Sequence, residues 1–278
     1  MKIRLLTGSL FLISFLNMKA QGKFSASANL KTELTNKIDF NETGIGITYY
    51  AIINSKSKIK NTLEYSNLKV IYDAENFEAL ENLDQFSQLK NKFEITREIS
   101  NLKLNIAFIP TANFQKNLDL SDVILLGSFE ISQKLNSRAN INVGVSRSTL
   151  FGYPQFMPTL SLQYNLNDKN NLLIGFPDSK ISYSNNIRNA FSLTNSFNGN
   201  FYNIDESFTA SKNKKISTSQ MTTALEYERN VDTNWFLNFK TGYDFNKKYN
   251  ILDNGNHKVY DFNIRNGYIL GIGIKYKQ

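Results

Sequence analysis

Apolar and polar residues alternate one by one along most of this chain. In one stretch, Gly44, Gly46 and Thr48 lie between apolar residues, which are Ile45, Ile47, Tyr49, Ala51 and Ile53. The same period of two recurs in the ranges 102–108, 139–146, 160–166 and 235–243. Side chains of a β-strand point alternately to opposite faces, so this period predicts strands with one apolar face. The chain is therefore expected to be all-β.

The polar face of these strands carries charge in mid-strand. The charged residues lie among Gly, Ser and Asn, and they are Glu94, Lys103, Glu130, Glu226, Lys240 and Lys275. Transmembrane barrels have this arrangement, with apolar side chains facing lipid and polar side chains facing a wet interior. These six residues are predicted to line the lumen of a barrel.

The chain closes on the sequence GYILGIGIKYKQ. Tyr268 and Tyr276 lie at the ends of its apolar face, and eight residue steps of about 3.3 Å separate them. At a tilt of about 40° this distance matches the apolar band of outer-membrane barrels, where aromatic girdles lie at both interfaces. An edge strand of a soluble sandwich or lipocalin is the alternative.

Short and long connections are expected to alternate. Short ones are predicted at Asn54–Lys58, Ser100–Asn101, Leu135–Ser137, Asn167–Lys169, Ser184–Ile187 and Asn230–Thr233. Long ones are predicted at Thr35–Asn41, Asp73–Asn91, Thr111–Ser121, Thr149–Phe156, Phe201–Thr218 and Asn246–Tyr260. With a tight turn at Pro177–Asp178, this pattern predicts an antiparallel up-and-down barrel of about 14 strands. Twelve strands is the alternative count. Both termini and the short turns are expected to face the periplasm.

One segment departs from the period of two. Apolar residues recur about every third position in ENFEALENLDQFSQLKNKF, residues 75–93, which predicts a short amphipathic helix in an outward loop.

The N-terminus predicts export. Lys2 and Arg4 precede an apolar run from Leu5 to Leu16, and small or polar residues follow up to Ala20. This is the pattern of a secretory signal peptide. We therefore expect residues 1–20 to be removed near Ala20 and residues 21–278 to form one barrel domain.

Composition and charge exclude several classes of function. The chain has no cysteine, and its formal net charge of +8 falls to +5 once Lys2, Arg4 and Lys19 leave with the signal. This modest, scattered charge does not indicate nucleic acid as a partner. The single histidine, His257, lies in a predicted loop, where an isolated histidine is expected to have no chemical role. Without cysteine, a zinc site would depend almost wholly on carboxylates, so no metal, cofactor or catalytic residue is predicted.

The segment GFPDSKISYSNNIRNAFSLTNSFNGNFY, Gly175–Tyr202, carries a Pro-Asp turn, a Ser-Tyr pair and an Asn-Gly-x-Phe element. Over these roughly 30 residues the chain resembles an uncharacterised outer-membrane β-barrel family of Bacteroidota. The resemblance implies an outer-membrane location and a barrel fold, and it implies no activity. The barrel-assembly machinery is then an expected partner, although Gln278 stands where many such barrels end in an aromatic residue.

The sequence thus predicts a non-enzymatic outer-membrane barrel, either a narrow pore for small solutes or a structural surface protein. An outer-membrane enzyme acting on lipid or glycan is the alternative. The long loops carry lysines, and Lys212, Lys214 and Lys215 are predicted to contact lipopolysaccharide. Outer-membrane lipids are the other expected partners.

Overall fold

The computed structural model describes residues 22–73, 83–186, 188–204 and 214–278, and these form a β-barrel. In chain order the strands are β1 (Lys23–Leu34), β2 (Ile38–Asn54), β3 (Ser57–Tyr72), β4 (Gln85–Ile99), β5 (Leu102–Phe114), β6 (Val123–Lys134), β7 (Ala139–Ser148), β8 (Gln155–Asn167), β9 (Asn170–Phe176), β10 (Asp178–Ser184), β11 (Asn189–Asn203), β12 (Lys215–Asn230), β13 (Trp235–Leu252), β14 (Lys258–Asp261) and β15 (Gly267–Lys277). A 3₁₀ turn, η2 (Leu120–Asp122), precedes β6.

Antiparallel pairing closes the sheet into a ring. β1 pairs with β2 on one side and with β15 on the other, and Ser25 lies opposite Lys277. β14 pairs with the end of β13 and extends the sheet beyond the ring, so fourteen strands make the barrel. The predicted count of fourteen is confirmed, as is the hairpin at Pro177, and the alternative of twelve strands is wrong.

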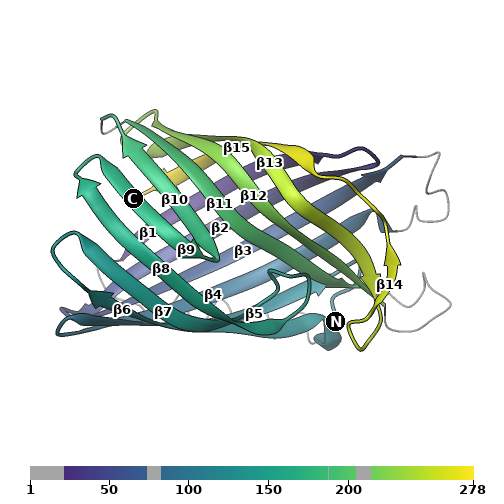
Figure 1. The fold of residues 1–278 in the computed structure, drawn as a ribbon, viewed down its shortest axis with the longest axis horizontal. Helices are drawn as coiled ribbons and strands as arrows, with labels where there is room; N and C mark the ends of the chain where they lie inside the picture. Colours follow the sequence, from purple (N-terminus) through teal and green to yellow (C-terminus); the bar gives the residue numbers. More distant parts are fainter. Residues whose placement is uncertain (1–21, 74–82, 187, 205–213) are drawn as a thin grey trace.

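The two ends of the barrel differ (Figure 1). We call the end at which β1 begins and β15 ends the terminal end, and the opposite end, where β14 lies, the loop end. Turns of two to four residues join strands at the terminal end, whereas most connections at the loop end are longer. The expected alternation of short and long connections is therefore present.

Alternation along each strand separates two faces. On β15, the side chains of Tyr268, Leu270, Ile272 and Ile274 are exposed on the outer face, as the sequence predicts. Gly271 and Gly273 face inward, opposite Lys31 and Asn29 of β1. Over most of the outer face no described segment covers the ring, so many of its apolar side chains are exposed to the surroundings.

The inside of the barrel is apolar at the loop end. We call this cluster the apolar plug. It consists of Ile38, Phe40, Leu68, Val70, Leu83, Phe86, Tyr202, Ile204, Ile216, Tyr249, Ile251 and Phe262, all of which are buried. Tyr249 contributes a ring 4.3 Å from that of Phe262, and its hydroxyl lies 2.7 Å from the hydroxyl of Tyr72. The plug fills the lumen at this end with side chains from strands on several sides of the ring.

Several predicted loops are wrong because the strands are longer than expected. β2 begins at Ile38, β4 at Gln85 and β12 at Lys215, while β13 continues to Leu252. At these ends the inward residues are apolar and pack in the plug, so the pattern of apolar outside and polar inside disappears although the strand persists.

The amphipathic helix predicted over residues 75–93 is wrong for its second half, because residues 85–93 belong to β4. Phe86 is fully buried in the plug, so its apolar character reflects the inside of a barrel and not a helix face. Residues 75–82 lie outside the described residues.

A β-bulge lies in β13 near the loop end. Its pairing with β12 shifts between Ser219 and Met221, and Asn246 has a left-handed φ of 51°. The extra residue changes the parity of the strand, so that Asp244 and Lys247 are both buried inside the barrel.

Candidate functional site: the lumen

The terminal half of the lumen is a cavity lined by charged and polar side chains. Its volume is about 670 Å³, and inward side chains of β1, β2, β10–β13 and β15 line it. The charged lining residues are Lys31, Glu42, Lys180, Glu226, Glu228, Lys240 and Lys275. Gly271 and Gly273 line the same wall and leave space beside these long side chains.

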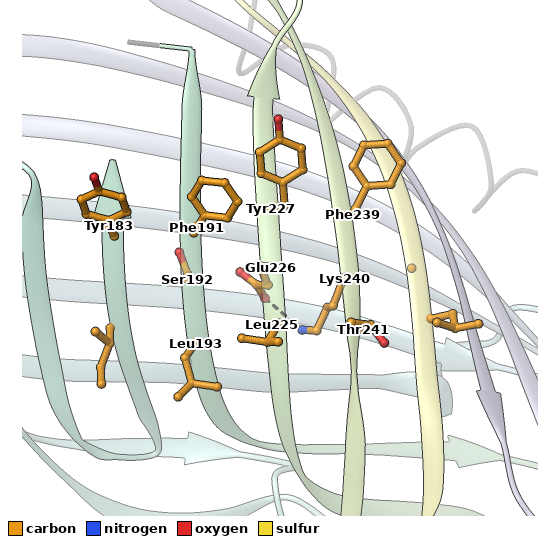
Figure 2. A pocket seen from close by; sticks show the side chains of 13 residues that line it. Tyr183, Phe191, Ser192, Leu193, Leu225, Glu226, Tyr227, Phe239, Lys240 and Thr241 are labelled. Carbon is orange, nitrogen blue, oxygen red and sulfur yellow. Dashed lines mark ion pairs between the residues drawn. The ribbon is translucent and has the colours of Figure 1, made fainter. Parts of the chain in front are cut away.

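Glu226 lies at the centre of this lining. Its carboxylate is 3.1 Å from Nζ of Lys240 on the next strand and 3.5 Å from Nζ of Lys180. The hydroxyl of Thr194 also donates to it, at 3.4 Å. Figure 2 shows the pair of Glu226 and Lys240 joined by a dashed line. One carboxylate shared by two ammonium groups leaves positive charge available to a solute.

A second shared carboxylate lies nearer the terminal end. Glu228 receives Nζ of Lys275 and Nζ of Lys277, each at 3.1 Å. On the other side of the ring, Glu94 pairs with Lys60 at 2.9 Å and Lys92 at 2.8 Å. Each of these carboxylates therefore has two lysines as neighbours.

Lys103 and Glu130 also have inward register positions. Lys103 pairs with Glu98 on β4 and with Ser132 on β6. Asn105 lies opposite Glu130 and donates to its carboxylate at 3.4 Å. The structure thus brings Glu226, Lys240 and Lys275 to one cavity and distributes Glu94, Lys103 and Glu130 over β4–β6.

A buried polar cluster separates the cavity from the plug. Lys247 makes ion pairs with Glu33 and with Asp244, the latter at 3.4 Å. The side chains of Lys247 and Asp244 are 2% and 0% exposed. Gln220 donates to Glu33 and Asp244, and Nζ of Lys247 lies 4.3 Å from the ring centre of Phe40 in the plug.

Sequence reasoning missed this cluster, because it assigned Lys247 to the loop Asn246–Tyr260. That assignment is wrong, since Lys247 lies inside the barrel on β13. The sequence signal for the bulge was Asn246, because asparagine adopts a left-handed φ more readily than most residues, followed directly by the charged Lys247.

The outer face carries an aromatic row at the level of the cavity. Tyr183, Phe191, Tyr227 and Phe239 lie side by side on β10–β13 (Figure 2). The rings of Phe191 and Tyr227 stack at 4.9 Å, and those of Tyr227 and Phe239 at 6.2 Å. Between this row and the aliphatic residues below it lies a shallow groove of about 560 Å³. The row has the character of an interfacial aromatic girdle.

The loop end holds the remaining predicted residues. Lys214 and Lys215 are partly exposed, and Nζ of Lys215 lies 5.1 Å from the ring centre of Phe201. Lys212 lies outside the described residues.

His257 is strongly exposed in the turn before β14, where its N–H donates to Asp253 at 2.9 Å. This backbone donor holds the pKa of the Asp253 carboxyl below its usual value. A contact with one carboxylate does not assemble a nucleophile and a base.

Within the described ranges, no three His, Asp or Glu side chains gather as a metal site. No helix in that part of the chain is long and apolar enough to cross a bilayer.

Similar folds occur among porins and channels. The match to the P. putida toluene transporter TodX covers 94% of this chain and 90% of that chain, with 8% identity and a TM-score of 0.50. For the NanC porin the identity is 8%, the coverage 91% and 100%, and the TM-score 0.44. For the KdgM porin the identity is 7%, the match covers 90% of this chain and 98% of that chain, and the TM-score is 0.36.

The ring of fourteen strands, its apolar outer face and its charged lumen define a porin-like outer-membrane β-barrel. Sequence comparison with curated proteins gives no match. Residues 16–277 match the family described as "Domain of unknown function (DUF6268)", and the chain belongs to that family. The family description names no bacterial group, so the assignment to Bacteroidota stays a prediction.

Proposed function

We propose that this protein is a non-enzymatic, narrow channel for small polar solutes in the outer membrane. The observation that carries the proposal is the cavity of about 670 Å³, whose wall is lined by lysines that share carboxylates. A lumen built only to stabilise the ring would be filled by side chains, as in eight-stranded barrels. A ring of fourteen strands instead leaves a charged cavity unfilled by side chains.

The apolar plug gives this channel a closed state. It occupies the loop end of the same lumen, and the cluster of Lys247, Glu33 and Asp244 lies directly beneath it. A solute that crosses the barrel must displace plug residues, of which Phe262 comes from the segment after β14 and not from a barrel strand. This segment is therefore the movable part of the gate in our proposal.

A structural surface barrel is the second candidate, and the plug itself favours it, because a permanently filled loop end blocks conduction. An enzyme acting on lipid or glycan has less support. The lumen carboxylates are neutralised by lysines, and the histidine lies apart from them in a loop-end turn.

Single-channel recording in planar bilayers tests the proposal. We expect small conductance steps from the refolded protein and larger or longer ones from Phe262→Ala, because that truncation removes a ring from the plug. Phe239→Ala, on the outer face, is the matched control and should conduct like the parent. Silent bilayers with both the parent and Phe262→Ala, each verified as inserted and folded, would favour the structural barrel.

We further propose that the loop end faces outward and contacts lipopolysaccharide through Lys212, Lys214 and Lys215. Lysine ammonium groups attract phosphorylated headgroups within about a Debye length, roughly 8 Å in physiological salt. Reversing the charge of all three should lower lipopolysaccharide co-purification at low salt, and an unchanged yield would contradict this contact. Export through a signal peptide at residues 1–20, which lie outside the described residues, belongs to the same proposal.

A further inference from the structure

The barrel wall has a gap above the hairpin β9–β10. This hairpin has only seven residues in each strand, and its turn lies partway along the barrel while β8 and β11 continue toward the loop end (Figure 1). β8 pairs with β9 from Leu160 onward, and β10 pairs with β11 up to Ser196. Residues 155–159 of β8 and 197–203 of β11 therefore lack a neighbouring strand on the sides that face each other.

An unpaired strand edge is costly at membrane depth. Backbone N–H and C=O groups have no water partner in hydrocarbon, so irregular backbone is tolerated there only when protein covers it or a wet cavity adjoins it. The last backbone bond of the wall, from Phe197 N to the Pro177 oxygen at 3.3 Å, lies at the floor of the gap. Something must cover the edges above this bond.

At the last residue of β11, Asn203 donates to the Ser121 oxygen at 2.8 Å and to the Asp122 carboxylate at 2.9 Å, both in η2. The connection between β7 and β8 covers the edge between this point and the hairpin. We call residues 149–154 the strap. Thr149 donates through its hydroxyl to the Gly199 oxygen on the free edge of β11, at 2.8 Å. Gly199 has to be glycine, because a Cβ there would collide with the carbonyl oxygens of Thr149 and Leu150. Farther along, Gly152 lies against Ser217 of β12.

The alternation of inward and outward residues along β11 and β12 places the strap on the outer side of the wall. Gly199 and Ser217 face outward, since their neighbours Asn198, Asn200 and Thr218 line a small internal cavity beside Lys247. The strap thus crosses β11 and reaches β12 from outside, while Asn198 lies on the lumen side at the edge of the gap.

Three phenyl rings close the outer mouth of the gap. Phe151 of the strap stacks on Phe176 of β9 at 6.2 Å and meets Phe197 of β11 at 5.9 Å. Phe176 and Phe197 lie 5.3 Å apart. Van der Waals contacts between rings and a few hydrogen bonds hold the strap, whereas a continuous ladder of backbone bonds holds the rest of the wall.

We propose that this gap is a lateral portal between the lumen and the membrane, with the strap as its door. The chemistry of the two sides points to an amphiphile with one apolar chain and a small polar head. A fully polar solute would not pass three phenyl rings into lipid, and a fully apolar one would not stay beside lumen lysines and glutamates. The head would lie near Asn198 and Ser196, and the chain would leave past Phe151. The portal does not require conduction along the barrel axis.

A reversible disulfide tests whether the strap must move. The chain has no cysteine, so an introduced pair has no competitor. A Cβ built on Gly152 lies 3.5 Å from Cβ of Ser217, within the range of a disulfide. The variant is the double substitution Gly152→Cys with Ser217→Cys. Gly152 has a left-handed φ of 91°, so a cysteine there is strained. The oxidised and reduced forms carry the same two substitutions and are therefore compared with each other.

The probe is an alkyl carboxylate with a diazirine at the head-group end, mixed into phosphatidylcholine vesicles that hold the refolded variant. After illumination, mass spectrometry locates the labelled residues. We expect label at Asn198 and Met157 in the reduced form and its loss in the oxidised form. Ile272, on the outer face of β15, should be labelled equally in both forms. Equal labelling of Asn198 in both forms, or none in either, would overturn the portal.

A second variant and a second probe distinguish the lateral portal from the proposed channel along the barrel axis. Gly199→Ala should displace the strap without a disulfide and raise the label at Asn198, whereas Gly271→Ala, where a Cβ has room, should not. A water-soluble diazirine sugar reports access along the axis. Its failure to reach Glu226 would count against the proposed channel, while the amphiphile result decides the portal independently.

Discussion

At the residue scale, neighbours along one strand have opposite surroundings. Ile272 is exposed on the outer face of β15, while Gly271 faces the cavity. The two faces therefore set different requirements, apolar surface outside and space or charge inside.

A polar substitution should therefore lower stability strongly on the outer face and only slightly on the inner face. We expect Ile272→Arg to lower stability by about 2–4 kcal/mol, because a guanidinium near the bilayer midplane loses its water. Gly271→Ser should cost far less, because a Cβ there has its nearest neighbour at 3.4 Å. Denaturant titration of both variants in lipid vesicles measures the difference. Equal losses would show that the faces are assigned incorrectly.

Lys247 provides a second test at this scale. Its removal leaves Glu33 and Asp244 buried without this counter-charge, so Lys247→Met should destabilise the fold by about 3–5 kcal/mol. The next residue, Lys248, is exposed, and Lys248→Met should change stability by no more than about 0.5 kcal/mol. Unfolding of the two variants in parallel checks this. Nζ of Lys31 also lies 3.0 Å from the Glu33 carboxylate, and a small effect at both positions would mean that Lys31 alone compensates Glu33.

At the element scale, irregular features determine what the lumen contains. The bulge in β13 turns Lys247 inward, and the short hairpin β9–β10 leaves the gap that the strap covers. Both features depart from a uniform ring of paired strands. The bulge changes which side chains are buried inside, and the hairpin changes where the wall is continuous.

The bulge should depend on the residue at position 246. A β-branched side chain at a φ of 51° is strained, so Asn246→Val should cost about 1–3 kcal/mol. Asn246→Gly should be nearly neutral, because glycine adopts this conformation freely. Thermal unfolding followed by gel mobility compares the two, and a tolerated valine would argue that the bulge does not need the left-handed residue.

At the scale of the whole molecule, the barrel has a closed end and an open one. The apolar plug fills the loop end, and the charged cavity occupies the terminal half. A barrel with this polarity presents different chemistry to the two sides of a membrane.

Protease added to intact cells should reveal which side is which. Lys258 is exposed at the loop end, whereas Lys56 and Lys169 are exposed in turns at the terminal end. We expect cleavage after Lys258 and protection of Lys56 and Lys169, with all three cut after the outer membrane is permeabilised. The reverse pattern in intact cells would mean that the barrel is inserted the other way round.

The period of two determined much about this protein from sequence alone. It predicted the all-β class, the fourteen strands and the outer face of β15, because outward residues interact with their surroundings and carry a local signal. The turn at Pro177 was equally local. Sequence also singled out the charged residues Glu226, Lys240 and Lys275, but it did not tell which carboxylate shares which lysines.

The tertiary structure alone decided the contents of the lumen. Phe86 and Tyr249 are 163 positions apart in sequence yet lie in one plug, whereas the local pattern predicts a helix around Phe86 and a loop around Tyr249. Lys247 gained its partners through a bulge, and the strap acquired its place through Gly199 on a strand far along the chain. The plug and the ion pair of Lys247 with Glu33 join strands from both ends of the chain, so these contacts form only once β1 meets β15.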